Sequence, residues 1–343
     1  MLKYQLAEQD LQKMIGALGP GEALPPVRRL IAESDFSQAT LMKALSLLEA
    51  RGLIERRRGA GIFTARVREH PAGTVAVMLS TLDNSTSGQL LCGIMKAMAR
   101  RSDQIVLLNS REYISKVLPA LTSGGIRQLI IYPNTPDLKN PEFLAMVEQL
   151  GELELRIATV EVPVPGLKCV FVGQENSHAF EEVALRLLKQ GVRSIAVTGN
   201  FNGIIYSSRL AGIRSAISRS GCASVTLKQI DEGDGDNAAS IARQLLESRC
   251  DAIMLCNSVS SREIAYQLRI LAGSRIDSIK IAGVVEQGER MPLEHAVTLE
   301  KQSIDLGIAA VNALYGNRST AKYLPMKIYY GDPAGAESHP KSF

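Results

Sequence analysis

Tryptophan is absent from the sequence, and aromatic residues make up only 5% of its 343 residues. No apolar run reaches the ~18 residues that a helix needs to cross a membrane, so we expect no membrane-spanning segment. Residues 1–13 have an amphipathic pattern with two acidic side chains, unlike the basic start and apolar centre of a secretion signal. These absences predict a cytoplasmic protein.

Sequence signals for catalysis and for metal binding are also missing. The five cysteines are scattered, with no Cys-x-x-Cys pair and no neighbouring histidine cluster, which predicts reduced and mostly buried thiols. The chain lacks a Gly-x-Ser-x-Gly motif, a phosphate-binding loop and a His-Glu-x-x-His motif, and its four histidines are dispersed. We therefore expect no catalytic residues, no metal and no cofactor, and a protein that is not an enzyme.

The net charge of +4 is concentrated near the start of the chain. Residues 1–70 contain eleven Lys and Arg against eight Asp and Glu, and the basic excess gathers between Arg51 and Arg68. Such a cluster suits a polyanion such as DNA, although a solvated basic surface has the same pattern.

Three short helices and a hairpin are predicted for this first segment. Apolar residues recur at helical spacing in 4–17, after Pro25-Pro26, and again from Ser37, a favourable N-cap, to about residue 52. Two short strands, 53–55 and 61–64, flank a basic tip that contains glycine. The second and third helices have helix-turn-helix spacing, in which the second helix of the pair enters the major groove.

Three stretches, Leu24–Arg28, Phe36–Leu41 and Leu48–Gly61, together resemble the winged helix-turn-helix of the GntR family of bacterial regulators. The resemblance covers about residues 10–65 and implies binding to double-stranded DNA at a palindromic operator. It places four features at DNA-contact positions: Arg28, Ser37, Thr40 and the Arg58-Gly59 tip. The outward-facing polar side chains of the third helix and the basic hairpin add Gln38, Lys43, Arg56 and Arg57 as candidates. The alternative is that the winged helix contacts another protein.

From Thr74 onward, short apolar runs alternate with helical stretches. This alternation predicts an α/β fold with βαβ units and parallel sheets, and the number of runs is too large for one compact lobe. The nine runs are 75–80, 105–109, 129–132, 157–160, 170–172, 195–198, 225–230, 252–256 and 279–284.

The pattern divides the chain into a winged helix (1–66), a polar linker (67–73) and an effector-binding and dimerisation domain (74–343). Within the last domain we expect a first lobe of about 74–162 and 291–322. The second lobe would hold about 163–290 and 323–335.

Several of these segments, among them Val75–Ser80, Gln190–Ala196 and Asp251–Asn257, resemble the effector domain of the LacI/GalR regulators. That fold is shared with periplasmic sugar-binding proteins and has two parallel-sheet, Rossmann-like lobes. The resemblance implies a homodimer with a small effector, a carbohydrate, between the lobes. Its most telling feature is the Arg-x-x-Gly that starts at Arg209, because the family's arginine at this place usually grips the effector.

Four polar residues follow the carboxyl ends of predicted strands, where parallel sheets bind ligands: Asn84, Arg111, Arg209 and Asn257. Each can bind a polyol or an anion. Simpler roles remain open, since Asn84 can shape a turn, Arg209 can pair with a carboxylate, and Asn257 can cap the helix near Ser261.

The family pattern is not fully kept in the predicted effector site. Ser258 and Val285 stand where the family usually has aspartates, which makes Glu286 and Lys301 further candidates for a rearranged site. The sequence as a whole predicts a transcription regulator, a repressor whose binding to DNA responds to a sugar or sugar derivative. The alternative is a small-molecule binding protein whose winged helix contacts protein.

Overall fold

The computed structural model describes residues 3–16, 18–19, 21–50, 53–57, 59–64, 74–79, 81, 84–99, 101, 104–109, 117–123, 126–222, 224–233, 237–316 and 321–331. The predicted linker and two candidate site residues, Arg58 and Arg111, lie outside these ranges. No helix within them has both the length and the apolar character needed to span a membrane.

The N-terminal domain has the predicted three helices and hairpin. Its elements are α1 (Lys3–Gly16), α2 (Val27–Ala32), α3 (Gln38–Ala50), β1 (Ile54–Arg57) and β2 (Gly61–Thr64). The strands pair antiparallel, and a bridge between Ala23 and Phe63 extends the small sheet. Leucines from all three helices form its core, with Ile54 and Ile62 packed against them from the hairpin.

Local sequence explains the boundaries of α3 and of the wing. Ser37 caps α3, because its Oγ accepts a hydrogen bond from the Thr40 N–H at 3.3 Å. Between β1 and β2, Gly59 and Gly61 adopt φ values of 75° and 115°, which side chains other than glycine rarely tolerate. The wing therefore turns tightly at an exposed tip.

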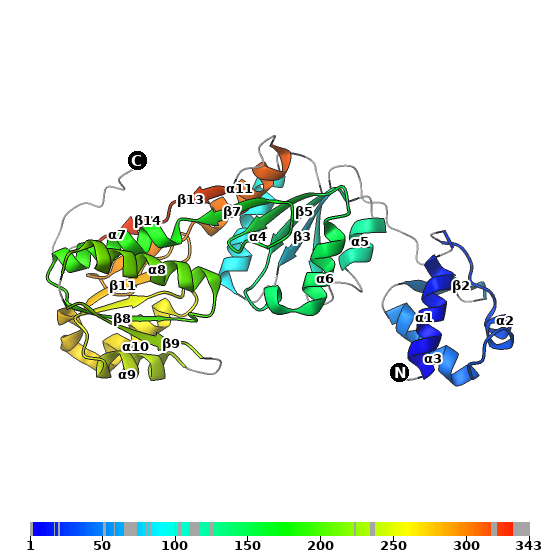
Figure 1. The fold of residues 1–343 in the computed structure, drawn as a ribbon, viewed down its shortest axis with the longest axis horizontal. Coiled ribbons are helices and arrows are strands. Elements are labelled where there is room, and N and C mark those ends of the chain that lie inside the picture. Colours follow the sequence, from blue (N-terminus) through cyan, green and yellow to red (C-terminus); the bar gives the residue numbers. More distant parts are fainter. Residues whose placement is uncertain are drawn as a thin grey trace.

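The first lobe is built on a six-stranded parallel sheet in the order β13-β7-β6-β5-β3-β4 (Figure 1). Its strands are β3 (Val75–Leu79), β4 (Ile105–Asn109), β5 (Gln128–Tyr132), β6 (Arg156–Val160), β7 (Val170–Gln174) and β13 (Lys322–Leu324). Its helices are α4 (Ser85–Met98), α5 (Leu118–Ser123), α6 (Pro141–Leu150) and α11 (Ser303–Tyr315), with a short 3-10 helix η2 (Asp137–Lys139).

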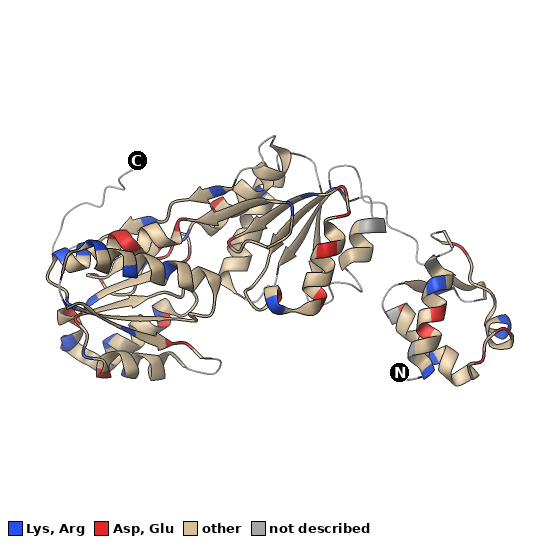
Figure 2. Ribbon diagram, in the orientation of Figure 1, with Lys and Arg blue, Asp and Glu red and all other residues tan. Residues whose placement is uncertain are grey.

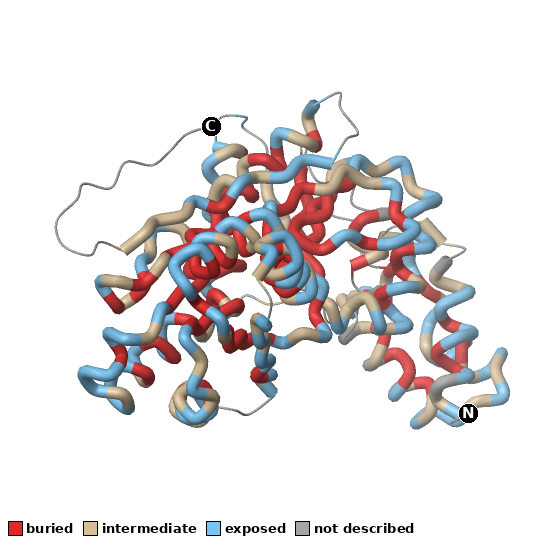
Figure 3. Tube along the Cα trace, turned by 60° about the vertical axis from the view of Figure 1, so that its left-hand side comes forward, coloured by how far each residue is buried: buried red, intermediate tan, exposed pale blue. Residues whose placement is uncertain are grey.

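Both faces of this sheet are buried, which explains why its strands read as continuous apolar runs. In β3, Val75 and Val77 belong to a core shared with α4 and α11, whereas Ala76 and Met78 belong to a core shared with α5 and α6. Figure 3 shows the resulting buried interior of the chain beneath exposed helices.

The second lobe repeats the plan with the order β14-β12-β11-β10-β8-β9, in which only β14 is antiparallel to its neighbour. Its strands are β8 (Ser194–Gly199), β9 (Thr226–Asp231), β10 (Ala252–Leu255), β11 (Lys280–Val285), β12 (Val297–Glu300) and β14 (Lys327–Tyr329). Its helices are α7 (Asn176–Lys189), α8 (Ile204–Arg219), α9 (Ala238–Glu247) and α10 (Ser261–Ala272), with a 3-10 helix η3 (Gly273–Ser278).

The chain crosses between the lobes later than the sequence pattern predicts. β7 pairs with β6 in the first lobe, although 163–290 is predicted for the second, and β12 pairs with β11 in the second, although 291–322 is predicted for the first. The crossings therefore follow β7, β12 and β13. An apolar run predicts a buried strand, but it does not say which strand lies beside it.

Close helix packing joins α4 to α11 within the first lobe. A Cβ atom on Gly93 of α4 would lie 1.9 Å from the carbonyl oxygen of Ile304, and one on Gly307 of α11 would lie 2.2 Å from that of Leu90. These two glycines let the helix backbones touch, which places the middle of α4 against the start of α11.

Candidate functional sites

The predicted DNA-reading surface gathers at the start of α3. Ser37, Gln38 and Lys43 are exposed and Thr40 is half-buried. The hydroxyls of Ser37 and Thr40 lie 2.9 Å apart in a hydrogen bond. Hydroxyl groups beside a helix N-terminus, where backbone N–H groups also point outward, are well placed to meet phosphate oxygens.

Several predicted basic DNA contacts have partners within the domain. Arg56 pairs with Glu49 at 3.1 Å, Arg57 pairs with Glu55 and lies over the Phe63 ring, and the Lys43 ammonium lies 4.1 Å from the ring centre of Tyr4. Exposed pairs of this kind contribute ~0–1 kcal/mol each, so a phosphate can displace them.

Two further candidates of the winged helix are free to meet DNA. Arg28 is exposed on α2 and has no ion pair among the described residues, and Gly59 forms the exposed tip of the wing. Figure 2 shows that α2 carries basic residues, whereas α1 carries acidic residues between basic ones. The α2–α3 side is therefore the better side for DNA.

A cavity of about 410 Å³ opens between the two lobes. Its walls come from the residues that follow β3, β5, β6, β8, β10 and β12, all at the carboxyl ends of strands. This is where parallel sheets place ligands. Four of the predicted effector residues line the cavity: Asn84, Arg209, Asn257 and Lys301.

Arg209 lies in the second turn of α8 and is only 2% exposed. Its Nε donates to Asn176 Oδ1 at 2.8 Å and its Nη1 donates to the Cys256 carbonyl at 2.5 Å. The rings of Phe180 and Tyr206 flank the guanidinium, with centres 5.5 and 5.9 Å from its carbon. No carboxylate within the described part of the chain pairs with it, so its charge is met only by neutral groups and the cavity.

The two asparagines on the cavity wall also shape the loops that carry them. Asn84 Oδ1 accepts from the Ser87 N–H at 2.9 Å and caps α4. Asn257 Oδ1 accepts from the Val259 N–H, and its Nδ2 donates to Glu232 at 2.8 Å. Asn257 thus shapes the loop before α10 and does not cap that helix.

Glu286 and Lys301 form a buried ion pair beside the cavity, with Nζ and Oε1 3.6 Å apart. Lys301 reaches the cavity wall, whereas Glu286 is fully buried and does not line it. The Glu286 carboxylate accepts hydrogen bonds from Thr86 (2.5 Å), Ser258 (2.6 Å) and Ser303 (2.7 Å). Burial alone would raise the pKa of Glu286, but the ammonium of Lys301 and these hydroxyls hold it below its ordinary value.

The structure adds lining residues that the sequence analysis missed. Most follow β5 or β8 or begin α8, and these are Tyr132, Asn134, Asn200, Asn202 and Tyr206. Their positions at or near strand ends could have predicted them from the sequence, whereas no sequence pattern predicts that Lys139, on η2, lines the cavity. Across the cavity mouth, the Ile204 N–H of the second lobe donates to Thr135 Oγ1 of the first at 3.2 Å.

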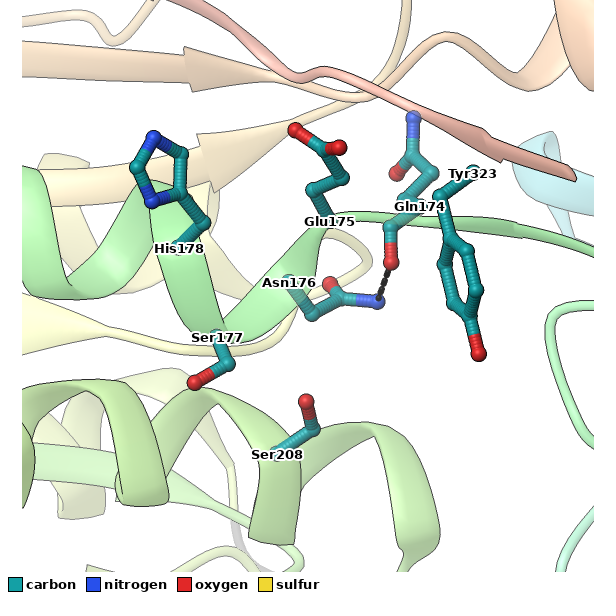
Figure 4. A pocket seen from close by; sticks show the side chains of 7 residues that line it. All are labelled: Gln174, Glu175, Asn176, Ser177, His178, Ser208 and Tyr323. Carbon is teal, nitrogen blue, oxygen red and sulfur yellow. Dashed lines mark hydrogen bonds between the residues drawn. The ribbon is translucent and has the colours of Figure 1, made fainter.

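A second hollow, of about 460 Å³, lies where the chain first crosses between the lobes. Figure 4 shows residues 174–178 passing from β7 into α7, with Ser208 of α8 and Tyr323 of β13 beside them. Asn176 Nδ2 donates to the Gln174 carbonyl at 3.5 Å. Neither lysine nor arginine lines this hollow, and it lies away from the strand ends of the second sheet, so the cavity around Arg209 is the better effector site.

Comparison with known proteins supports the two halves separately. Residues 3–64 match the family model for bacterial regulatory proteins of the gntR family. Over 72 residues the chain is 40% identical to the uncharacterized HTH-type transcriptional regulator YydK of Bacillus subtilis (strain 168), covering 20% of this chain and 29% of that protein. Over 44 residues it is 48% identical to the Uxu operon transcriptional regulator of Escherichia coli (strain K12), covering 13% and 17%. The chain thus spans less than a third of either relative.

Solved structures match the two-lobed domain in fold. A LacI family transcriptional regulator from Enterococcus faecium, with bound ribose, aligns with a TM-score of 0.62 at 17% identity, covering 75% of this chain and 98% of that one. The Cra transcriptional dual regulator from Pseudomonas putida, in complex with fructose 1-phosphate, aligns with a TM-score of 0.57 at 15% identity, covering 76% and 98%.

These matches confirm the predicted architecture: a GntR-type helix-turn-helix domain precedes a domain with the two-lobed fold of LacI-type regulators and periplasmic binding proteins.

Proposed function

We propose that the chain is a ligand-responsive transcription regulator of the cytoplasm, a repressor that binds a palindromic operator and is not an enzyme. The observation that carries the proposal is the presence, on one chain, of a GntR-type DNA-binding domain and a cavity at the strand ends of a LacI-type fold. Similar structures hold ribose and fructose 1-phosphate, which supports a carbohydrate effector.

The proposed regulator works as a homodimer. Two winged helices on one two-fold axis match the two halves of a palindrome. Tyr266 and Ile270, four residues apart on α10, are 54% and 57% exposed and form an apolar surface that suits pairing of effector domains. An effector that favours one arrangement of the lobes then shifts the population between DNA-binding states.

The proposal is tested by DNA binding of the purified full chain. We expect nanomolar, salt-sensitive binding to DNA from the region upstream of its own gene, because lysine and arginine contacts to phosphates release counterions. Arg28→Ala should weaken binding by roughly tenfold, whereas Arg275→Ala, an exposed arginine of the second lobe, should leave it unchanged. Fluorescence anisotropy at several salt concentrations measures both effects.

The alternative, a winged helix that contacts protein, predicts a different result. Equal and weak DNA retention by the parent chain and by the Arg28→Ala variant, at low salt, would favour that alternative. The matched arginine control separates a loss of specific contacts from a general loss of positive charge.

A further inference from the structure

We propose that the effector is an anionic sugar derivative, and that Arg209 and the start of α8 hold its phosphate or carboxylate group. The inference rests on the proposed function in one respect, that the cavity between the lobes is the effector site. It adds the charge of the ligand, which the fold alone does not specify.

The charge on the cavity wall favours an anion. Lys139, Arg209 and Lys301 line the cavity, and among the described residues around it there is no aspartate or glutamate on the wall. Glu286 neutralises Lys301 from behind. Lys139 on the first lobe and Arg209 on the second line the cavity without an ion pair among the described residues, so an anion between the lobes would meet a cation from each side.

Arg209 is built to bind a group that the protein does not supply. It is almost fully buried, and its two hydrogen bonds go to an amide oxygen and a backbone carbonyl. Burying a guanidinium without a carboxylate partner costs folding free energy, and a bound anion would offset that cost. These two bonds use Nε and Nη1, which fixes the plane of the group and leaves Nη2 without a partner among the described residues. A phosphate or carboxylate oxygen is the strongest acceptor for it.

The start of α8 adds a second positive element to the same wall. The helix has sixteen residues, and its N-cap, Gly203, offers no side chain to cap the first turn. The Ile204 N–H already donates to Thr135, but no side-chain partner is seen for the N–H groups of Ile205 and Tyr206, and both residues line the cavity. The positive end of a helix dipole favours an anion at this place.

The acidic residues near the cavity lie behind its wall. Glu232 accepts hydrogen bonds from Asn257 and Ser260, and neither Glu232 nor Glu161 lines the cavity. At Ser258, a hydroxyl on the wall donates to Glu286. The wall therefore offers side-chain amides and hydroxyls, which both donate and accept, and no carboxylate, so its charged groups, Lys139 and Arg209, favour an anionic group on the ligand.

Thermal unfolding of the full chain with matched ligands tests the inference. The probes are inorganic phosphate, glucose, glucose 6-phosphate and glucuronate, each at 10 mM. We expect at least one of the three anions to raise Tm by roughly 2–4 °C and glucose to leave it unchanged. Phosphate against glucuronate distinguishes the two anionic groups.

Variants assign the effect to the cavity. Arg209→Gln should abolish the anion-dependent shift, and Lys139→Met should reduce it, because each removes one of the two cations that line the cavity without an ion pair. Lys280→Met is the control, since Lys280 is exposed at the opposite end of the strands. If Arg209→Gln fails to fold by circular dichroism, Lys139→Met, an exposed position, carries the test.

Three outcomes would overturn the inference: equal stabilisation by glucose and the anions, no stabilisation by any anion, or a shift that both cavity variants retain in full. None of these outcomes changes the expected effect of Arg28→Ala on DNA binding. A failure of the inference that the effector is anionic is therefore distinguishable from a failure of the proposed function.

Discussion

Among single residues, Glu286 connects several elements of the two-lobed domain. Its carboxylate is fixed by a hydroxyl from α4, one from the loop after β10 and one from the start of α11, and it faces the ammonium of Lys301. The next residue continues the connection, because the Gln287 backbone exchanges two hydrogen bonds with Gln89 of α4. The end of β11, in the second lobe, is thereby fastened to the first.

We predict that Glu286→Gln destabilises the protein by about 3–5 kcal/mol at pH 7, because it leaves the buried ammonium of Lys301 without a counter-charge. Adding Lys301→Met removes that charge, so the double variant should recover most of the loss. Urea denaturation of the parent and the three variants measures the cycle. Additive losses in the double variant would contradict a direct ion pair.

The pH dependence of the same pair has a defined sign. The folded pKa of Glu286 is depressed, so its contribution is fully present above the unfolded carboxyl pKa, about 4.3, and is lost as the pH falls through the folded pKa. The stability difference between the parent and Glu286→Gln should therefore shrink on acidification below about pH 4. A difference that stays constant from pH 6 to pH 3 would be inconsistent with a charged Glu286.

At the scale of elements, the contact between α4 and α11 depends on glycine. We predict that Gly93→Ala destabilises the protein by roughly 2–3 kcal/mol or more, because the new methyl group would overlap the Ile304 carbonyl. Gly88→Ala, in the same helix, meets open space and should be neutral or stabilising by up to ~1 kcal/mol. Denaturant midpoints of the two variants check the difference, and similar midpoints would count against close backbone contact.

The sequence predicted where the helices and strands lie better than it predicted which strands pair with one another. All nine apolar runs form strands, and the Ser37 cap and the glycine-containing wing tip lie where residue chemistry placed them. Three strands lie outside the predicted runs: β12 has only four residues, and β13 and β14 have three each and are half exposed, which leaves no clear periodicity. The lobe of β7 and of β12 was not predictable, since strand pairing is set by distant contacts.

The candidate effector site shows the same limit. Asn84, Arg209 and Asn257 were found because they follow strand ends, and they do lie on one cavity. Glu286 was chosen for its charge, but only the three-dimensional structure shows that its carboxylate is used by Lys301 and three hydroxyls. Lys139 reaches the cavity through a loop whose path no local pattern indicates.

For the whole molecule, the proposed dimer makes α10 a surface that two chains share. We predict that Tyr266→Glu weakens self-association by roughly tenfold or more and lowers DNA affinity with it, because one winged helix then binds only half of a palindrome. Leu144→Glu, an exposed apolar residue of α6, is the matched control. Sedimentation equilibrium measures the association, and unchanged association of the Tyr266 variant would exclude this face.

The threefold crossing of the chain has a consequence for synthesis on the ribosome. Each lobe takes one of its edge strands, β13 or β14, from residues 322–329, so neither sheet is complete until these residues have emerged. The winged helix is continuous in sequence within residues 3–64 and has its own core. Domains generally fold as units from the N-terminus during synthesis. The winged helix of a nascent chain is therefore complete well before either sheet of the two-lobed domain.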